Sequence, residues 1–298
     1  MLLPLQDLDL TGLRSMLQVQ FGASDAPFEF FPVGSDSWQY RVDDLWVSIR
    51  QDLRGHRPES YEAARILEDS GLKFVLAPLA GEDGKVTRLF NGRPVVVSRF
   101  RDISPIKSPS ASEILETQCM LHALHGIDER LSLSCEDFTM PFKADIYQAL
   151  EFDLDETEDL GPYARKAHAM ICLNRPMIEK HLKEIENITQ ICVNMNIDFV
   201  LTHGEPGDGN VVQSEGRLML GDWGELMWGP EERDWFHLHR SFGSAPSCRP
   251  VLHRFYELRW FFNELTEYTS HFFKSHSGGR DESIMWENFT ACFDSVGK

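Results

Sequence analysis

Hydrophobic and polar positions follow two different patterns along the 298-residue chain. In the first hundred residues, short apolar runs bounded by Gly, Pro, Asn and Asp predict strands. The predicted strands are 28–31, 38–42, 45–49, 74–79, 87–90 and 94–100. Apolar residues at helical spacing predict helices at 9–18 and 58–70, and the second has Pro58 in its first turn and Gly71 after its end. We therefore expect an antiparallel sheet of about five strands with one helix.

Beyond Pro105 the apolar positions recur at helical spacing. Amphipathic helices are predicted at 110–125, 138–152, 235–242, 251–273 and 282–296. Residues 161–196 predict two further helices that meet near Arg175–Pro176, because Pro breaks the hydrogen-bond pattern of a helix. The chain is therefore predicted to be an α+β protein with a sheet-rich part at 1–100 and a mainly helical part at 101–298.

The segment from Phe199 to Trp235 interrupts the helices and gathers polar residues around a predicted hairpin. A buried strand is predicted at 199–201, and two more surround a turn at 214–216. The hairpin brings Asn210 and Asp222 beside each other, and their side chains carry the oxygen ligands that Mg²⁺ prefers. Glu205 stands five positions before Asn210.

This spacing matches the phosphoryl-transfer template, in which an acid orients the acceptor hydroxyl and an Asn and a second Asp hold metal. The pattern His203-Gly204-Glu205…Asn210…Asp222 resembles the aminoglycoside phosphotransferase family of small-molecule kinases. Asp222-Trp223 followed by residues 229–234 is most similar to the spectinomycin phosphotransferase branch. Glu205 departs from the pattern, because the family has Asp at that position. The alternative is a Gly-rich hairpin in an unrelated α/β protein.

The resemblance implies a two-lobed protein-kinase-like fold, with a nucleotide-binding lobe at 1–100 and a catalytic and substrate-binding lobe at 101–298. It implies that Glu205 orients or deprotonates the acceptor hydroxyl and that Asn210 and Asp222 hold Mg²⁺. The cofactor would be ATP or GTP. Backbone groups of the hinge after the last strand would hold the base, which makes Ser98 and Phe100 candidate contacts.

The phosphate-binding Lys of kinase-like folds is missing from the strand at 45–49. By resemblance its place falls at Ser48, and Arg50 lies two residues later on the same side of the strand. Arg50 either supplies the missing charge to the phosphates or is a surface residue at the strand end. Glu62 and Glu68 are candidates for the helix acid that pairs with this cation, or are solvated helix residues.

The chain is strongly acidic, with 29 Lys and Arg against 47 Asp and Glu and a net charge of −18. This charge disfavours nucleic acid and anionic membranes as partners and attracts cationic small molecules, although it also serves solubility alone. An acid-rich segment at 151–159 either holds a polycationic substrate or is a solvated loop. The six cysteines are scattered, and neither a signal peptide nor a membrane-spanning stretch is visible. We therefore expect free thiols in a cytoplasmic protein.

Together these features predict an ATP-dependent O-phosphotransferase that acts on a hydroxyl of a small, cationic, aminoglycoside-like antibiotic, as in antibiotic resistance. One alternative is a kinase for another metabolite, such as a choline-, sugar- or nucleoside-like substrate. The other is a non-catalytic pseudokinase, favoured by the missing strand Lys and by Glu205. Asn210 and Asp222 argue against the pseudokinase, because metal ligands have no evident use without nucleotide phosphates.

Overall fold

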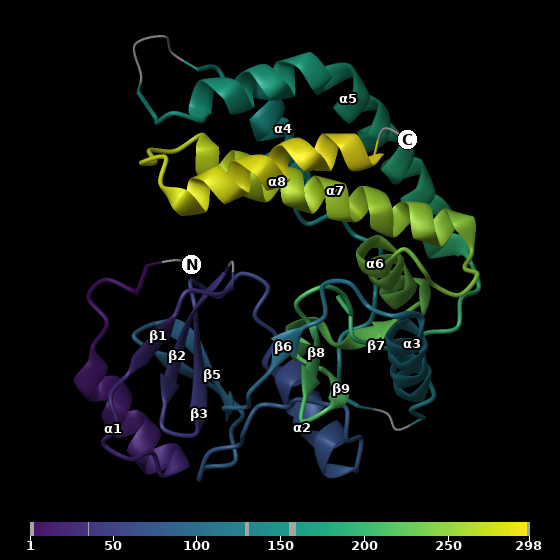
Figure 1. Cartoon of the computed structure of the whole chain (residues 1–298). Coiled ribbons are helices and arrows are strands. Elements are labelled where there is room, and N and C mark those ends of the chain that lie inside the picture. Colours follow the sequence, from purple (N-terminus) through teal and green to yellow (C-terminus); the bar gives the residue numbers. More distant parts are fainter. Residues whose placement is uncertain (1–2, 35, 129–130, 155–158, 297–298) are drawn as a thin grey trace. The chain divides into compact units, whose positions relative to one another are not determined.

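A computed structural model describes residues 3–34, 36–128, 131–154 and 159–296. The chain divides into two compact units, which are described separately (Figure 1). Unit 1 comprises residues 1–136 and 198–246, and unit 2 comprises residues 137–197 and 247–298. The predicted lobes follow chain order, whereas this division by compactness groups the hairpin segment with the N-terminal sheet.

Unit 1 contains a five-stranded antiparallel sheet in the order β1-β2-β3-β5-β4. Its strands are β1 (Glu29–Phe31), β2 (Ser37–Val42), β3 (Leu45–Arg50), β4 (Thr87–Phe90) and β5 (Arg93–Arg99). Burial alternates along β3, so that Leu45, Val47 and Ile49 join one core with Leu13 and Leu17 of α1 (Leu10–Phe21). The side chains between them therefore lie on the opposite face, which we call the inner face of the sheet.

The rest of unit 1 surrounds the hairpin segment. Its elements are α2 (Pro58–Asp69), β6 (Ser104–Pro105), α3 (Ala111–His125), β7 (Val200–Thr202), β8 (Val211–Ser214), β9 (Arg217–Leu220), the 3₁₀ turn η1 (Trp223–Glu225), β10 (Met227–Gly229) and α6 (Glu232–Phe242). The small sheets are β6-β8-β9 and β10-β7. A second core, with residues from α2, α3, the hairpin and α6, supports this segment. The predicted hairpin is confirmed, and Glu215 and Gly216 make its turn at positive φ.

The prediction of a strand at 74–79 is wrong. Only Val75 forms an isolated bridge, to Leu220 of β9, while the Leu79 N–H donates to the Val97 carbonyl at 2.7 Å. Val75 and Ala77 are buried, because this segment runs between the five-stranded sheet and the hairpin. Burial on both sides gives such a connection the apolar composition of a strand.

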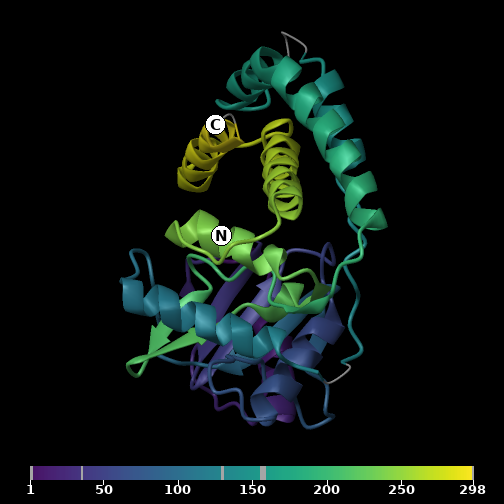
Figure 2. The ribbon, with the colours of Figure 1, turned by 90° about the vertical axis from the view of Figure 1, so that its right-hand side faces the viewer.

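Unit 2 consists of the helices α4 (Lys143–Glu151), α5 (Ala164–Asn194), α7 (Pro250–Phe272) and α8 (Arg280–Val296). α7 packs against the other three, and Figure 2 shows α7 and α8 side by side. The predicted break at Arg175–Pro176 is wrong, since α5 runs through Pro176. Buried Ile171 and Ile178 lie on either side of the Pro, so the packing of one apolar face outweighs the lost hydrogen bond.

The α+β, kinase-like arrangement predicted from the sequence is confirmed by these elements and by the solved structures described below. Within the part of the chain that the structure describes, no helix has the length and apolar character needed to cross a membrane. The predicted acid-rich segment at 151–159 falls partly on residues 155–158, which lie outside the described residues.

Candidate active site

The hairpin places Asn210 and Asp222 side by side. The Gly221 N–H donates to the Asn210 carbonyl at 2.9 Å, which closes the open end of the β8–β9 ladder directly before Asp222. The Asn210 side chain donates through Nδ2 to the Glu205 carbonyl at 3.0 Å. This bond turns the amide so that Oδ1, the atom able to ligate a cation, is left as an acceptor. A carboxylate and an amide oxygen are together suited to a hard cation such as Mg²⁺.

Asp222 has an unusual backbone conformation, with φ 55° and ψ 74°. A non-glycine residue in the left-handed region costs free energy, and such residues are concentrated at functional sites. Asp222 is open to solvent, yet protein atoms crowd around its carboxylate. This crowding, and then the nearby Asp36 carboxylate, raise the pKa of Asp222 above its ordinary value. A bound cation would relieve both effects, because it favours the charged form of the carboxylate.

His203 connects the Glu205 loop to the end of the β8–β9 hairpin that leads into Asp222. Its Nε2 lies 2.8 Å from the Gly221 carbonyl, and its Nδ1 accepts the Glu205 N–H at 3.3 Å. A carbonyl only accepts, so Nε2 carries the proton and the ring is neutral. Burial lowers the pKa of His203, in agreement with this assignment. His203 therefore fixes the loop by hydrogen bonds.

Asp234, at the start of α6, anchors the same loop from below. Its carboxylate is fully buried and accepts from the N–H groups of His203 at 3.0 Å and Gly204 at 2.7 Å, and from His125 Nε2 at 2.9 Å. Burial alone would raise the pKa of Asp234, but the hydrogen bonds from His125 and the Gly204 N–H, together with the electrostatic effect of the two histidines, outweigh it and hold the pKa below its ordinary value. Gly204 is required here, because its φ is 102° and a Cβ would collide with the Arg233 guanidinium.

Arg233 and Asp234 are neighbours in the sequence but have different partners. Arg233 donates to the Thr202 hydroxyl at 3.1 Å and pairs with Glu225 at 3.3 Å. Both residues nevertheless hold the segment around Asn210 and Asp222. Asp234 does so through the Glu205 loop, and Arg233 does so through the turn after Asp222.

Arg50 lies on the inner face of the sheet and its side chain is only 19% exposed, which does not fit a surface residue at a strand end. It pairs with Asp36, in the turn before β2, at 2.9 Å and is hydrogen-bonded to the Tyr61 hydroxyl. Burial alone would lower the pKa of Arg50, but Asp36 and Tyr61 raise it, so the guanidinium stays charged. The Asp222 carboxylate also raises the pKa of this guanidinium. The cation is therefore held near the proposed metal ligand.

The helix acid predicted to pair with this cation is not found. Glu68 pairs with Arg65, one turn back on the same helix, and Glu62 points to solvent. Tyr61 of α2 takes the position beside Arg50 instead. Burial, and then the Asp222 carboxylate, raise the pKa of Tyr61, so that the phenol stays protonated.

Ser48, at the place of the missing Lys, makes a hydrogen bond to Gln39, which donates in turn to the Ser37 hydroxyl at 2.8 Å. These uncharged side chains lie beside Arg50 on the inner face. An aromatic group follows along the same face, where Trp46 contacts Phe31 at 5.0 Å and Phe100 at 6.0 Å between ring centroids. The inner face thus changes from charged to polar to aromatic.

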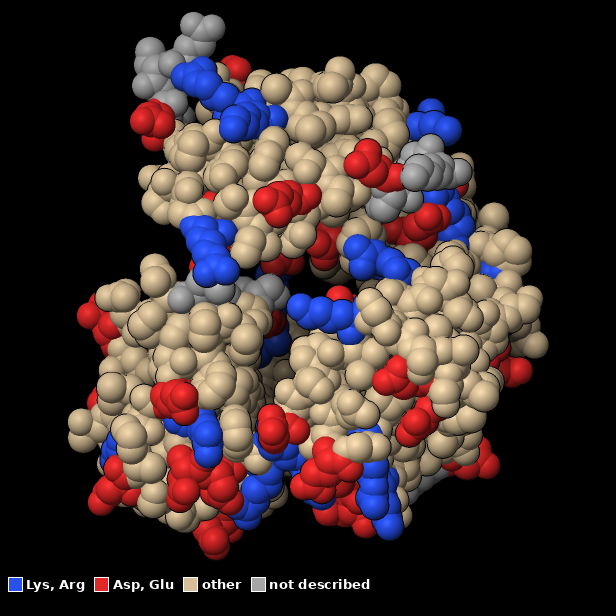
Figure 3. Space-filling model, viewed as in Figure 1, with Lys and Arg blue, Asp and Glu red and all other residues tan. Residues whose placement is uncertain are grey.

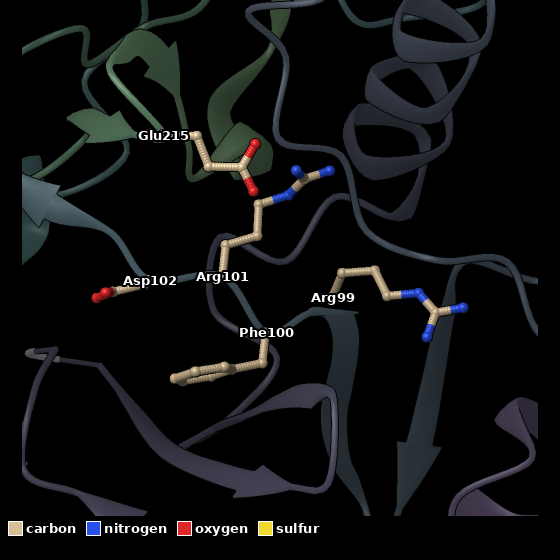
Figure 4. Close-up of a pocket in the computed structure, with 5 residues that line it drawn as sticks. All are labelled: Arg99, Phe100, Arg101, Asp102 and Glu215. Atoms are coloured by element: carbon tan, nitrogen blue, oxygen red, sulfur yellow. The ribbon is translucent and has the colours of Figure 1, made fainter.

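A cavity of about 490 Å³ lies at the hinge that follows β5. Its lining residues are Arg99, Phe100, Arg101, Asp102 and Glu215. Figure 4 shows Arg101 pointing toward Glu215, whereas Phe100 and Asp102 point to the other side of the hinge. Neither Asn210 nor Asp222 lines the cavity. Phe100 belongs both to the lining of the cavity and to the aromatic group. The Phe100 N–H donates to the Asp44 carbonyl at 2.7 Å, so this backbone donor is already used.

All the site residues predicted from the sequence lie in unit 1. The hairpin brings Glu205, Asn210 and Asp222 together, the sheet adds Ser48 and Arg50, and Ser98 and Phe100 lie at the end of β5. Sequence reasoning missed Asp36, Tyr61, Phe31 and Trp46, and it named Phe100 of the aromatic group only as a backbone contact. Trp46 was accessible to it, because it lies two residues before Ser48 and so on the same face of the strand.

Comparisons with known proteins agree with this arrangement. No family model matches the chain. Protein StrN of Streptomyces griseus is 37% identical over 271 residues, which cover 88% of this chain and 85% of StrN. A spectinomycin phosphotransferase solved with ADP and spectinomycin superposes with a TM-score of 0.72 at 16% identity over 96% of this chain and 95% of that one. A choline kinase from Streptococcus pneumoniae gives 0.53 at 14% identity over 96% and 98%.

Proposed function

The chain belongs to the aminoglycoside phosphotransferase family of protein-kinase-like small-molecule kinases, and from this premise we propose that it transfers the γ-phosphoryl group of ATP or GTP to a hydroxyl of a small molecule. The observation that carries the proposal is the cluster of Asp222, Asn210 and Arg50, two oxygen ligands and a cation, in one unit. Phosphoryl transfer depends on positioning and charge neutralisation, which such a cluster supplies.

The nucleotide would lie along the inner face of the sheet. Its base would stack near Trp46 and Phe100, next to the hinge cavity, because aromatic faces suit a planar base. The polar side chains of Ser48 and Gln39 would follow, and the phosphates would reach Arg50. This order matches the chemistry of a nucleotide from its apolar end to its charged end.

Each catalytic element has a separate role. Asn210 and Asp222 would hold Mg²⁺, which would supply positive charge to neutralise the phosphates. Arg50 would contact the phosphates with a guanidinium that keeps its charge. Glu205 would orient the acceptor hydroxyl and take its proton, from a loop fixed by His203 and Asp234. Holding this loop still is itself catalytic, because a displacement of ~1 Å can cost about 100-fold in rate.

The acceptor class we propose is a cationic, aminoglycoside-like antibiotic, and a cell that phosphorylates it would be resistant to it. The net charge of −18 supports a cationic acceptor. On the face shown in Figure 3, acidic side chains are interspersed with Lys and Arg. Acceptor affinity should therefore fall with salt as the screening length shortens to ~8 Å at physiological ionic strength. Affinity that does not change with salt, or a preference for anionic acceptors, would contradict this class.

The test is a nucleotide-consumption screen across aminoglycosides, spectinomycin-like compounds and common metabolites including choline. Asp222→Ala should abolish turnover, whereas the control Asp69→Ala, on exposed helix surface, should leave it unchanged. Far-ultraviolet circular dichroism would show that both variants are folded. Turnover by Asp222→Ala at the wild-type rate would refute the kinase proposal. Turnover of choline or a sugar alone would select the metabolite-kinase alternative.

A further inference from the structure

The cation on the inner face of the sheet is not held by the partner that is usual in kinases. A strand cation is normally held by a helix carboxylate, but here neither Glu62 nor Glu68 of α2 reaches Arg50. Asp36 pairs with Arg50, yet its side chain is 49% exposed and comes from a turn rather than from a helix. A second, rigid partner is needed to fix the guanidinium.

Tyr61 has the required rigidity. Its side chain is 7% exposed and packs with Val86 and with Val96 of β5. The neighbouring Ser60 hydroxyl donates to the Leu226 carbonyl at 2.8 Å, which docks α2 against the turn that follows Asp222. The position of the Tyr61 hydroxyl is therefore fixed both by the sheet and by the turn that follows Asp222.

The hydroxyl lies close to both the cation and the proposed metal ligand. It accepts a hydrogen bond from Arg50. It also lies beside Gly224, where a Cβ would stand 2.7 Å from the hydroxyl oxygen and 3.6 Å from Asp222 Oδ1. A phenol can both accept and donate hydrogen bonds, and the charges of Arg50 and Asp222 both act on Tyr61. One uncharged group can thus orient both charged ones.

A carboxylate in this position would be unfavourable. With Asp36 and Asp222 it would make a third acid around one guanidinium, and the surplus negative charge would repel the phosphates. Arg also differs from Lys in carrying five donors in a fixed fork, which can serve Asp36 and Tyr61 together. Arg50 and Tyr61 therefore form a matched replacement for the usual pair.

We propose that Tyr61 is a positioning residue that couples Arg50 to Asp222 and takes the place of the helix carboxylate. The proposal rests on the proposed function, because it requires a nucleotide whose phosphates meet Arg50 and whose metal meets Asp222. Tyr61 touches neither nucleotide nor acceptor, and it acts by fixing the two groups that do.

The test measures Mg·AMP-PNP binding by calorimetry for the wild type, Tyr61→Phe and the control Tyr40→Phe. Tyr40 is also a buried tyrosine whose hydroxyl accepts one hydrogen bond, from the Leu5 N–H at 3.0 Å, but it lies in the core on the α1 side of the sheet. Tyr61→Phe should weaken binding about tenfold, the order of loss expected for a hydrogen bond to a charged group. Tyr40→Phe should stay within about twofold of the wild type.

Two further variants separate positioning from general destabilisation. If Tyr61 acts through Arg50, the losses of Tyr61→Phe and Arg50→Lys should combine to less than their product. Gly224→Ala should weaken binding in the wild type, because its methyl group would press on the hydroxyl, and should have little further effect in the Tyr61→Phe variant. This second comparison remains decisive even if one variant loses stability.

The outcomes are distinct. Wild-type affinity in Tyr61→Phe, or multiplicative losses in the double variant, would overturn the positioning role while leaving the proposed function intact. Failure of the wild type to bind either Mg·AMP-PNP or the corresponding GTP analogue would remove the proposed function and the positioning role together.

Discussion

Replacing Asp234 by Asn tests the anchoring of the catalytic loop, because it keeps the shape of the side chain and removes its charge. The native carboxylate offers two acceptor oxygens to three donors: Oδ1 receives the Gly204 N–H, and Oδ2 receives the His203 N–H and His125 Nε2. Asn offers one oxygen and one NH₂ group. In either orientation, a donor amide therefore faces at least one donor of the loop.

The expected cost follows from this mismatch. Each buried donor left without a partner costs about 1–3 kcal/mol, and Asp234 is fully buried. One or two such donors give a loss of about 1–6 kcal/mol in the free energy of unfolding. This is a large share of the ~5–15 kcal/mol that stabilises a typical domain. The loop that carries Glu205 would also shift, and turnover should fall by about 100-fold for a ~1 Å displacement.

The pH dependence provides a second signature. The pKa of Asp234 is depressed below its ordinary value of 3.8, so its contribution is fully present above about pH 4 and is lost as the pH falls through the folded-state pKa. The stability difference between the wild type and Asp234→Asn should therefore shrink as the pH falls below 4. A difference that grew below pH 4 would contradict the assignment of Asp234 as a stabilising anion.

Urea unfolding followed by tryptophan fluorescence would measure the loss. Five of the seven tryptophans (residues 38, 46, 223, 228 and 235) belong to unit 1, so the signal reports mainly on the unit that contains the site. The matched control is Asp44→Asn, because Asp44 pairs with Arg99 where both side chains are more than half exposed. It should cost no more than ~1 kcal/mol. Equal losses for the two variants would refute the reasoning.

Three further outcomes are expected. Glu205→Gln should lose most turnover but keep Mg·nucleotide affinity, since Asn210 and Asp222 remain, and Glu205→Asp should be no faster than the wild type; equal rates for Gln and Glu would deny the carboxylate a role. Asp36→Asn should tighten nucleotide binding by about two- to fivefold in calorimetry, because a partly exposed ion pair worth ~0.2–1 kcal/mol no longer competes for Arg50; weaker binding would instead make Asp36 a ligand of the phosphate–metal group. Glu184→Gln in unit 2 should lower the free energy of unfolding by about 1–2 kcal/mol at pH 7. This loss should fade between pH 4.5 and pH 2, because hydrogen bonds from Arg254 lower the pKa of Glu184 from 4.5 to about 2. A loss in urea unfolding that is the same at pH 7 and pH 3 would contradict that cause.

The parts of the molecule that were predictable from sequence are those fixed by local chemistry. The β8–β9 hairpin follows from two residues at positive φ between apolar runs. The helix from Ala111 follows from Ser110 and Glu113, which form a capping box. Local rules also explain the errors. Pro176 predicts a break because propensity counts the lost hydrogen bond, whereas the folded unit also counts the buried face around it.

The arrangement around Arg50 was beyond local rules. Its partners come from a turn before β2, from α2 and from the end of β9, and no spacing in the sequence relates these segments. Glu62 has the charge that the kinase template asks for, yet it stands one residue from Tyr61 and so about 100° around the helix. Reasoning from charge alone therefore pointed to Glu62, whereas the direction of the side chains around the helix places Tyr61 beside Arg50.

Asp222 provides the strongest argument for metal binding at this site. Its left-handed backbone carries a cost of about 1–3 kcal/mol, and crowding and Asp36 further disfavour its charge. Gly221 stands immediately before it and could have taken a strained conformation more cheaply than Asp222 does. A protein that only presents a surface gains nothing from a costly acid that is open to solvent. A protein that binds a divalent cation there recovers the cost whenever the cation is bound, because the cation favours the ionised carboxylate. The arrangement of Asp222 is therefore accounted for by the metal-dependent chemistry proposed for this site, even though the strand Lys is missing and Glu replaces the catalytic Asp.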